Sequence, residues 1–368
     1  FEITSQKVGE ENNKTFKITL VKNNGEADEE IEVRENSKYE NLPTPKKVGT
    51  KFLYWKDENG KIITENTIVS QTKTNKLYAY YGENTYRIAY NLNGGISSNA
   101  PTGATYDKDV TIANPTKEVT VTIDGNNQGA TLTKTSYTGS PVFTGWTGSN
   151  LSNTALVNNV SWNGTLTKET KFKNLTSELN GTVTLTANYN ETSVTLDTPT
   201  KAGYTCGYTD ESTGAIKYTT SITVSDNKTI YVKCNPNTYT INFDSDGGTT
   251  VSSKTATYDS KIGTLTNPTK TGYNFAGWYL DTESITSESV YKYAKDITLK
   301  AKWTEATNTK YTVNYYLQTL DKKYDKVTES VVYTGTTNKT VDAALKTYEG
   351  FVTPSKQTVK ILADGSAK

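Results

Sequence analysis

The sequence predicts a mainly β protein built from small units in tandem, and three observations support this. Short segments alternate apolar and polar residues, which is the period of a half-buried strand. A turn that contains Pro recurs between these segments, and so does an aromatic pair of the form Phe-x-x-Trp. Because repetition at a regular spacing is typical of repeat proteins, we expect an elongated tandem array.

The alternation is clearest in four segments that begin a unit, which we name opening strands. They lie at residues 16–20, 86–92, 239–243 and 311–317. A second alternating segment, the closing strand, is expected at residues 77–81, 185–189, 230–234 and 299–303. Both kinds of strand should bury one face and leave the other in water.

The Pro turn and the aromatic strand lie between opening and closing strands. The turn recurs at residues 42–46, 112–117, 196–201 and 265–270, where Pro fixes φ and interrupts strand pairing. The predicted core aromatics are Phe52, Trp55, Phe143, Trp146, Phe275, Trp278 and, in a closing strand, Trp303. We interpret them as core because each small unit must bury an aromatic; a carbohydrate-stacking platform is the alternative.

These marks predict five units. They are residues 1–84 (an N-terminal segment and unit 1), 85–190, 191–236, 237–308 and 309–368. The second unit carries an insertion at residues 118–141, which alternates like a hairpin about Asp124 and Gly125. The third unit is short and lacks an opening strand, and the fifth is truncated before any closing strand.

The fourth unit carries the most specific pattern. An opening strand ends in Asp-Gly-Gly at residues 246–248, followed by Asn-Pro-Thr-Lys at 267–270, Phe-Ala-Gly-Trp at 275–278 and a closing strand that ends at Trp303. This resembles the Listeria–Bacteroides repeat, also called the internalin B-type repeat. The first two units are similar to it with drift, the third resembles a shortened copy, and residues 309–368 resemble a mucin-binding-protein-type repeat. The resemblance implies β-grasp-like α+β units, each with strands around one short helix, displayed in tandem on a bacterial surface protein.

Composition narrows the possible functions. The 368 residues include no His and no Met, two Cys, 40 Lys and Arg, and 39 Asp and Glu. Without His the chain lacks the commonest general base and metal ligand, so we expect no enzyme, no metal site and no cofactor. Arginine occurs only at Arg34 and Arg87, and the net charge is +1, so no nucleic-acid partner is expected. No apolar run approaches the ~20 residues of a spanning helix, so no direct membrane insertion is expected in what we interpret as a cut fragment.

Two short motifs have competing interpretations. Residues 244–248 (Asp-Ser-Asp-Gly-Gly) could form a calcium loop, but the matching residues 91–95 contain no carboxylate, which favours a hairpin turn. Residues 42–45 (Leu-Pro-Thr-Pro) superficially resemble a cell-wall sorting signal, yet they align with the shared Pro turn. Isopeptide cross-links between Lys and Asn side chains remain an open alternative. The abundance of Lys and Asn is no evidence for them, because both residues are common throughout the sequence.

The two cysteines are predicted to form a disulfide. When the third unit is aligned with the fourth on the shared Pro-Thr-Lys-x-Gly-Tyr run, Cys206 falls at or beside the position of Phe275 and Cys234 on that of Trp303. Two facing aromatics would thus be exchanged for two facing thiols in the smallest unit, whose core is usually insufficient without a cross-link. Two buried free thiols are the alternative.

The functional expectation is a structural stalk or spacer of a bacterial cell-surface adhesin or fibrous surface protein. The setting would be extracellular, at the cell surface or cell wall. The alternative is a module that binds a host glycan or surface protein, through residues 85–190, because insertions in repeats often map to binding faces.

Overall fold

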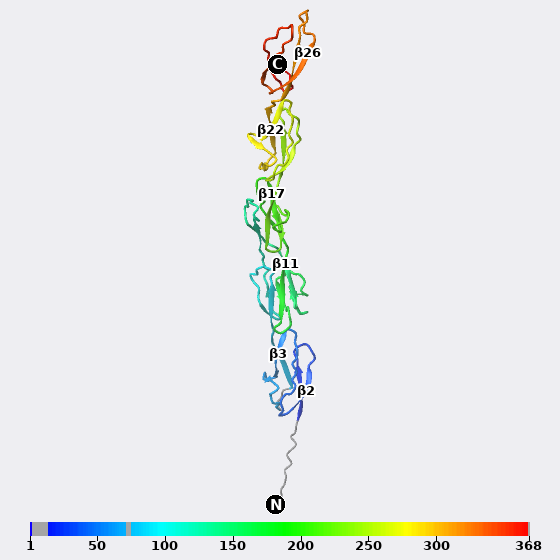
Figure 1. The fold of residues 1–368 in the computed structure, drawn as a ribbon. Helices are drawn as coiled ribbons and strands as arrows, with labels where there is room; N and C mark the ends of the chain where they lie inside the picture. The colour runs from blue at the N-terminus through cyan, green and yellow to red at the C-terminus, as the bar shows by residue number, and fades with distance from the viewer. Residues whose placement is uncertain (2–13, 71–74, 367–368) are drawn as a thin grey trace. The chain divides into compact units, whose positions relative to one another are not determined.

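The computed structural model describes residue 1, residues 14–70 and residues 75–366. It divides into two compact units: Phe1–Thr122 with Ser136–Leu196 and Ser221–Thr229, and Ile123–Thr135 with Asp197–Thr220 and Ile230–Lys368. The described residues form strands and no helix, as the ribbon shows (Figure 1). The mainly β class is therefore confirmed.

The first sheet, the β1 sheet, lies in the first compact unit and has the order β2-β1-β5-β3-β4. Its strands are β1 (Thr15–Val21), β2 (Glu29–Arg34), β3 (Thr50–Asp57), β4 (Ile62–Ile63) and β5 (Lys76–Glu83). The opening strand β1 pairs in parallel with the closing strand β5, and β5 pairs antiparallel with β3. Leu20, Trp55 and Leu77 are buried on one face, so the alternation predicts the core side correctly.

The β6 sheet repeats this arrangement in the same compact unit, in the order β11-β15-β6-β7. It contains β6 (Thr85–Asn91), β7 (Gly103–Thr105), β11 (Phe143–Ser149) and β15 (Thr182–Tyr189). A small second sheet, in the order β13-β12-β14-β8, is formed by β8 (Val110–Thr111), β12 (Leu156–Val157), β13 (Val160–Ser161) and β14 (Lys171–Lys173). Trp162 and Phe172 from this segment join Trp146 in one core, which makes this core the largest of the three repeats.

The predicted hairpin at residues 118–141 is present, but its strands belong to another sheet than expected. Strand β9 (Val119–Asp124) pairs antiparallel with β10 (Ser136–Gly139). Their sheet, the β9 sheet, has the order β10-β9-β19-β17 with β17 (Tyr204–Thr209) and β19 (Lys228–Pro236). The sequence suggested that residues 191–236 lack an opening strand. In the structure, β17 and β19 from these residues share a sheet with β9 from the insertion. Residues 125–135 join β9 to β10, so Asp124 and Gly125 do not form a two-residue turn.

The chain path therefore interleaves two sheets. After β6 and β7 it forms β9 and β10, and only then returns to β11 and β15 of the β6 sheet. Strands β16 (Thr192–Thr195) and β18 (Ser221–Val224) pair antiparallel with each other within the first compact unit. The domain boundary expected at residue 190 does not separate these segments cleanly.

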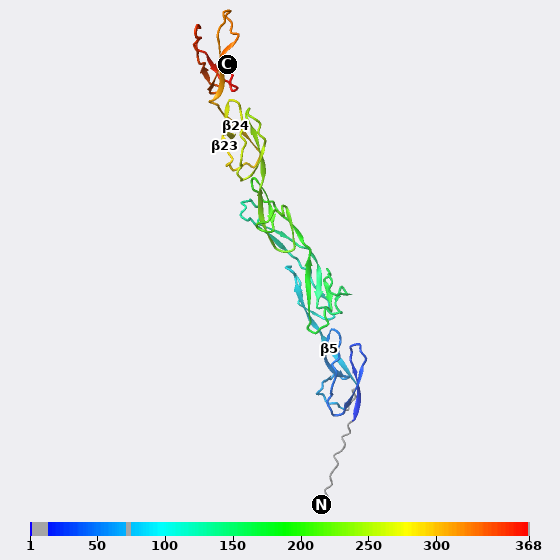
Figure 2. The ribbon, with the colours of Figure 1, turned by 45° about the vertical axis from the view of Figure 1, so that its right-hand side comes forward.

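The β20 sheet, in the second compact unit, has the order β21-β20-β24-β22-β23. Its strands β23 and β24 are labelled in Figure 2. Its strands are β20 (Thr238–Asp244), β21 (Lys254–Thr257), β22 (Tyr273–Leu280), β23 (Glu283–Ile285) and β24 (Ile297–Glu305). β20 is parallel to β24, and β24 is antiparallel to β22, as in the two sheets of the first unit. Three sheets thus share one topology.

The short helix implied by the resemblance is absent from the described residues. Its place after the second strand is taken by the Pro turn and flanking loops, which supply Tyr39 and Leu42 to the β1 core and Ile262 and Leu265 to the β20 core. Pro43 and Pro45 offer no backbone N–H and disfavour α geometry in the residue before them, which explains the irregular backbone there.

The last described strands are β25 (Thr309–Tyr316), β26 (Val327–Gly335), β27 (Thr340–Asp342) and β28 (Thr358–Lys360). They form two separate antiparallel pairs, β25 with β26 and β27 with β28. The opening strand and its hairpin partner are thus present in this segment, and no closing strand follows them among the described residues.

Candidate functional site

The predicted core tryptophans lie where the sequence places them, each on the aromatic strand of its sheet. Trp55 and Trp278 are 2% exposed and Trp146 is fully buried. The indole N–H of Trp278 donates to the Thr266 carbonyl at 3.0 Å, and that of Trp55 to the Pro43 carbonyl at 2.9 Å. Each of these two rings therefore fastens the Pro turn to the sheet, so these rings have no face left for a ligand.

A second aromatic position lies directly across the aromatic and closing strands. Phe275 pairs with Trp303, Phe52 with Tyr81 and Phe143 with Tyr189. Ring centroids in these pairs lie 5.6, 6.0 and 5.8 Å apart with their planes steeply inclined, an arrangement that favours edge-to-face attraction. We name this cross-strand position the end pair. Its members are partly buried against the core of their sheet.

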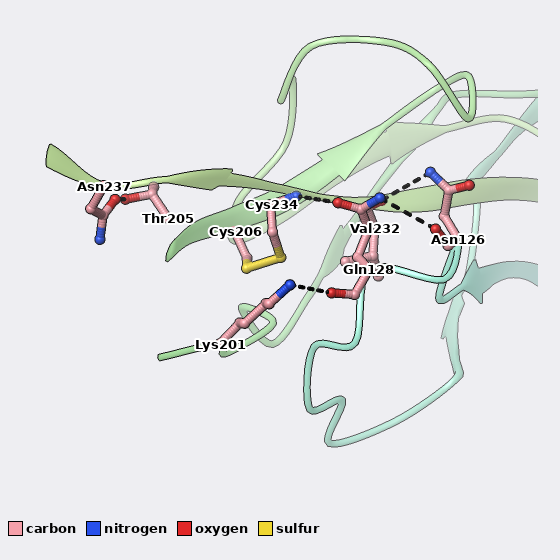
Figure 3. Close-up of a disulfide and its surroundings, with 8 residues drawn as sticks. All are labelled: Asn126, Gln128, Lys201, Thr205, Cys206, Val232, Cys234 and Asn237. Carbon is pink, nitrogen blue, oxygen red and sulfur yellow. Dashed lines mark hydrogen bonds between the residues drawn. A yellow bond between two sulfur atoms is a disulfide. The ribbon is translucent and has the colours of Figure 1, made fainter. Parts of the chain in front are cut away.

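Cys206 and Cys234 occupy the end pair of the β9 sheet and are joined by a disulfide (Figure 3). They face each other across β17 and β19, and both are almost completely buried. The disulfide therefore replaces, at the same cross-strand position, the aromatic contact of the other sheets.

Residues 125–135 form hydrogen bonds beside this disulfide within the second compact unit (Figure 3). The Gln128 side-chain oxygen accepts the Cys234 backbone N–H at 3.2 Å, and the Gln128 carbonyl accepts the Lys201 ammonium at 2.9 Å. Lys201 in turn lies 4.0 Å from the centroid of the Tyr204 ring. The side-chain amide of Asn126 also donates to the Val232 carbonyl. The loop after β9 thus supplies polar partners to β19.

An ion pair with a buried lysine holds the start of the hairpin in the first compact unit. The Lys117 side chain is 7% exposed, and its ammonium lies 2.7 Å from Asp226 Oδ1. The hydrogen bond from Lys117, aided by the Ser225 hydroxyl, lowers the pKa of the Asp226 carboxyl. The Asn227 side-chain oxygen accepts the Thr120 backbone N–H at 2.8 Å. The turn before β19 is thus hydrogen-bonded to the first residues of β9.

The two motifs with competing interpretations form turns. Asp244 accepts the backbone N–H of Asp246, which has a positive φ of 48°, and the Asp246 carboxylate lies 3.2 Å from the Lys300 ammonium. Leu42 packs against the β1 core, within the Pro turn. The described residues contain no group of three or more His, Cys, Asp or Glu side chains that could hold a metal ion. They also contain no helix long and apolar enough to cross a membrane.

Successive sheets are joined by a recurring backbone junction. In the second compact unit, the Asn237 N–H donates to the Gly203 carbonyl, and the Tyr258 N–H donates to the Asn237 carbonyl, both at 2.9 Å. The same two bonds recur one repeat later with Gly272, Ala306 and Thr337 in these roles. We name this arrangement the junction.

Glycine is required at the first position of each junction. Gly203 has a φ of +79°, and a Cβ added there would lie 2.5 Å from the Tyr258 ring. Gly49 in the first compact unit has a φ of +71° and is covered in the same way by Tyr106, whose N–H donates to Asn84. The following sheet thus packs directly on the turn glycine of the preceding one. The sequence shows these glycines, but it does not show which later residue covers them.

A hollow of about 640 Å³ lies beside β25 and is lined by Tyr315, Tyr348, Phe351 and other largely apolar side chains. At its edge Lys346 forms a short ion pair with Glu329, whose other oxygen accepts the Tyr348 hydroxyl at 2.9 Å. These bonds lower the pKa of Glu329, while a hydrogen bond with Tyr333 raises the pKa of Tyr315 to about 12. The acidic group is therefore ionised and paired at neutral pH, and the phenol is protonated, so this wall offers neither a free base nor an activated nucleophile. Sequence reasoning missed this site because its walls are far apart along the chain.

Parts of this chain are similar to parts of known proteins. Internalin H of Listeria monocytogenes is 34% identical over 183 residues, which cover 42% of this chain and 32% of that protein. A protein of Evansella cellulosilytica named "Putative Gly-rich membrane protein" is 42% identical over 83 residues, or 22% of this chain and 10% of its own length. The chain thus spans a third or less of these relatives.

The family model of the Listeria-Bacteroides repeat domain matches residues 16–80, 174–233 and 239–302. The first and third matches contain most of the β1 and β20 sheets, and the second runs from β15 to β19. The β6 sheet repeats the same strand order although its first strands lie outside the matched ranges. Since the matches cover half of the sequence, this chain belongs to the Listeria-Bacteroides repeat family.

Proposed function

We propose that this chain is a stalk or spacer region of a bacterial surface protein and that it acts outside the cell. The observation that carries the proposal is the junction, which recurs with the same two backbone hydrogen bonds and a covered glycine. A spacer must hold successive repeats at a fixed separation, and a junction closed by backbone bonds and packing serves that purpose. The extracellular setting is supported by the disulfide, because disulfides persist in oxidising environments.

Distance measurements across one junction test this proposal. Spin labels attached through non-cysteine chemistry at the exposed residues Thr213 and Thr282 would report on the junction at Gly203. We expect a narrow distance distribution in the unaltered chain. A broad distribution would show freely jointed beads and would contradict the spacer role.

A matched pair of variants identifies the junction as the cause. Gly203→Ala should broaden the distribution, because its Cβ would meet the Tyr258 ring. Gly350→Ala is the control, since Gly350 has the same φ of +79° but no atom within 4 Å of the added Cβ. Equal effects of the two variants would indicate that packing at the junction does not restrict motion.

Binding of a host glycan or surface protein is the second candidate function. The observation that favours it is the hollow beside β25, since apolar, aromatic-lined hollows with a few polar groups are the usual form of small-ligand sites. Residues 85–190 expose scattered apolar side chains, such as Ile96 and Val160, but these belong to separate segments of the chain. A glycan array probed with the whole chain, with Tyr348→Ala as the variant, tests this role. Loss of a bound glycan in the variant would support it, and an array without any signal would contradict it.

A further inference from the structure

We propose that the β1, β6 and β20 sheets are mechanical clamps that resist tension applied along the chain. In each sheet the chain enters on the opening strand and leaves on the closing strand. These two strands are direct neighbours and run parallel: β1 with β5, β6 with β15, and β20 with β24. The inference goes beyond the spacer role, because a spacer needs only length and not resistance to force.

The direction of the strands decides how a load reaches the hydrogen bonds. Tension draws the opening strand toward its N-terminus and the closing strand toward its C-terminus. Because the strands are parallel, these ends lie at opposite ends of the pair, and the load slides one strand along the other. The evenly spaced bonds of the parallel ladder are then strained together, whereas strands pulled from the same end would lose their bonds one at a time.

Packing protects the same strands. Both strands of each clamp are interior to their sheet, since β5, for example, has β1 on one side and β3 on the other. The side chains of Leu20, Leu77, Leu185 and Leu299 on the clamp strands are fully buried. Sliding one strand would therefore break core packing along with the ladder, which raises the barrier that governs forced unfolding.

The number of residue pairs in the parallel ladder differs among the sheets, and it predicts a rank order of the forces at which the sheets open. Among the described residues, the parallel register contains three residue pairs in β1–β5, four in β20–β24 and five in β6–β15. If the ladder carries the load, the β1 sheet should open at the lowest force and the β6 sheet at the highest.

Single-molecule pulling on the full chain tests the clamp through two tether geometries. In one, tethers at Asn235 and Asn308 load β20 and β24 from opposite ends. In the other, tethers at Thr250 and Asn308 enter after β20 and draw β21 from the end where it begins, so strands are peeled. All three sites are exposed, and neither geometry places the β1 sheet, the β6 sheet or the strands after Asn308 under load. Opening of the β20 sheet should release roughly 240 Å in the first geometry and roughly 190 Å in the second, at ~3.5 Å per residue, which identifies the event.

We expect the β20 sheet to open at a clearly higher force in the first geometry than in the second. Equal forces, or a lower force in the first geometry, would overturn the clamp. Neither of these results would affect the spacer role, which depends on the junction and is tested by the label distances.

Discussion

The end pair shows how one structural position accepts two chemistries. Three sheets fill it with Phe opposite Tyr or Trp, and the β9 sheet fills it with Cys206 opposite Cys234. An aromatic pair stabilises through buried area and ring contact, whereas a disulfide acts mainly by restricting the unfolded chain. The exchange places the covalent link in a sheet whose strands come from segments far apart in sequence.

Reduction of this disulfide should destabilise the β9 sheet. The cysteines are 28 residues apart, for which loop-closure entropy predicts about 3–4 kcal/mol. Urea unfolding of the oxidised chain and of Cys206→Ala/Cys234→Ala should differ by that amount. Mass spectrometry of the unfolded, non-reduced chain after alkylation supplies the independent check, and two alkylated thiols would contradict the cross-link.

Trp278→Ala should destabilise the β20 sheet by roughly 3–5 kcal/mol, as for other buried aromatics. The change removes a buried ring and leaves the Thr266 carbonyl without its indole donor. Hydrogen exchange should show the loss in β20, β22 and β24 and little change in the β1 sheet, because stability in repeats is local. Unchanged thermal unfolding would mean that Trp278 does not contribute to the core.

The Lys117–Asp226 pair predicts a pH dependence. Lys117 lowers the native pKa of Asp226 below its ordinary value of 3.8, so the stabilising contribution is complete above 3.8 and is lost as the pH falls through the native pKa. The stability difference between the unaltered chain and Asp226→Asn should be present at about pH 7 and should shrink as the pH falls below 3.8 and through the native pKa. The difference should be small, since the Asp226 side chain is 73% exposed to screening solvent. A difference that persists unchanged in acid would assign the effect to something other than this charge.

At the scale of elements, local pattern predicts strands well and predicts their partners poorly. Alternation locates β1, β6, β20 and their closing strands, because period two follows from the pleat itself. The same pattern in residues 119–123 does not reveal that β9 belongs with β19 and not with β6, since pairing depends on contacts a hundred residues away. The disulfide was predictable because internal repetition gave both cysteines a position on known strands.

The expectation of a short helix failed for a different reason. It was expected from a resemblance and not from periodicity, and the segments that take its place are rich in Pro and turn formers. Their apolar residues, such as Leu42 and Leu265, reach the core from irregular backbone. The hollow beside β25 could not be predicted at all, because residues 313–318 and 343–357 meet only in the folded chain.

At the scale of the whole molecule, the repeats are proposed to act in series as a spacer. Small-angle scattering of the full chain tests this proposal most directly. A unit of about 68 residues has a radius of gyration near ~11 Å and a width of roughly 28 Å, so five in line should give a maximum dimension on the order of 140 Å. A globular profile with a maximum dimension near ~70 Å would contradict the claim.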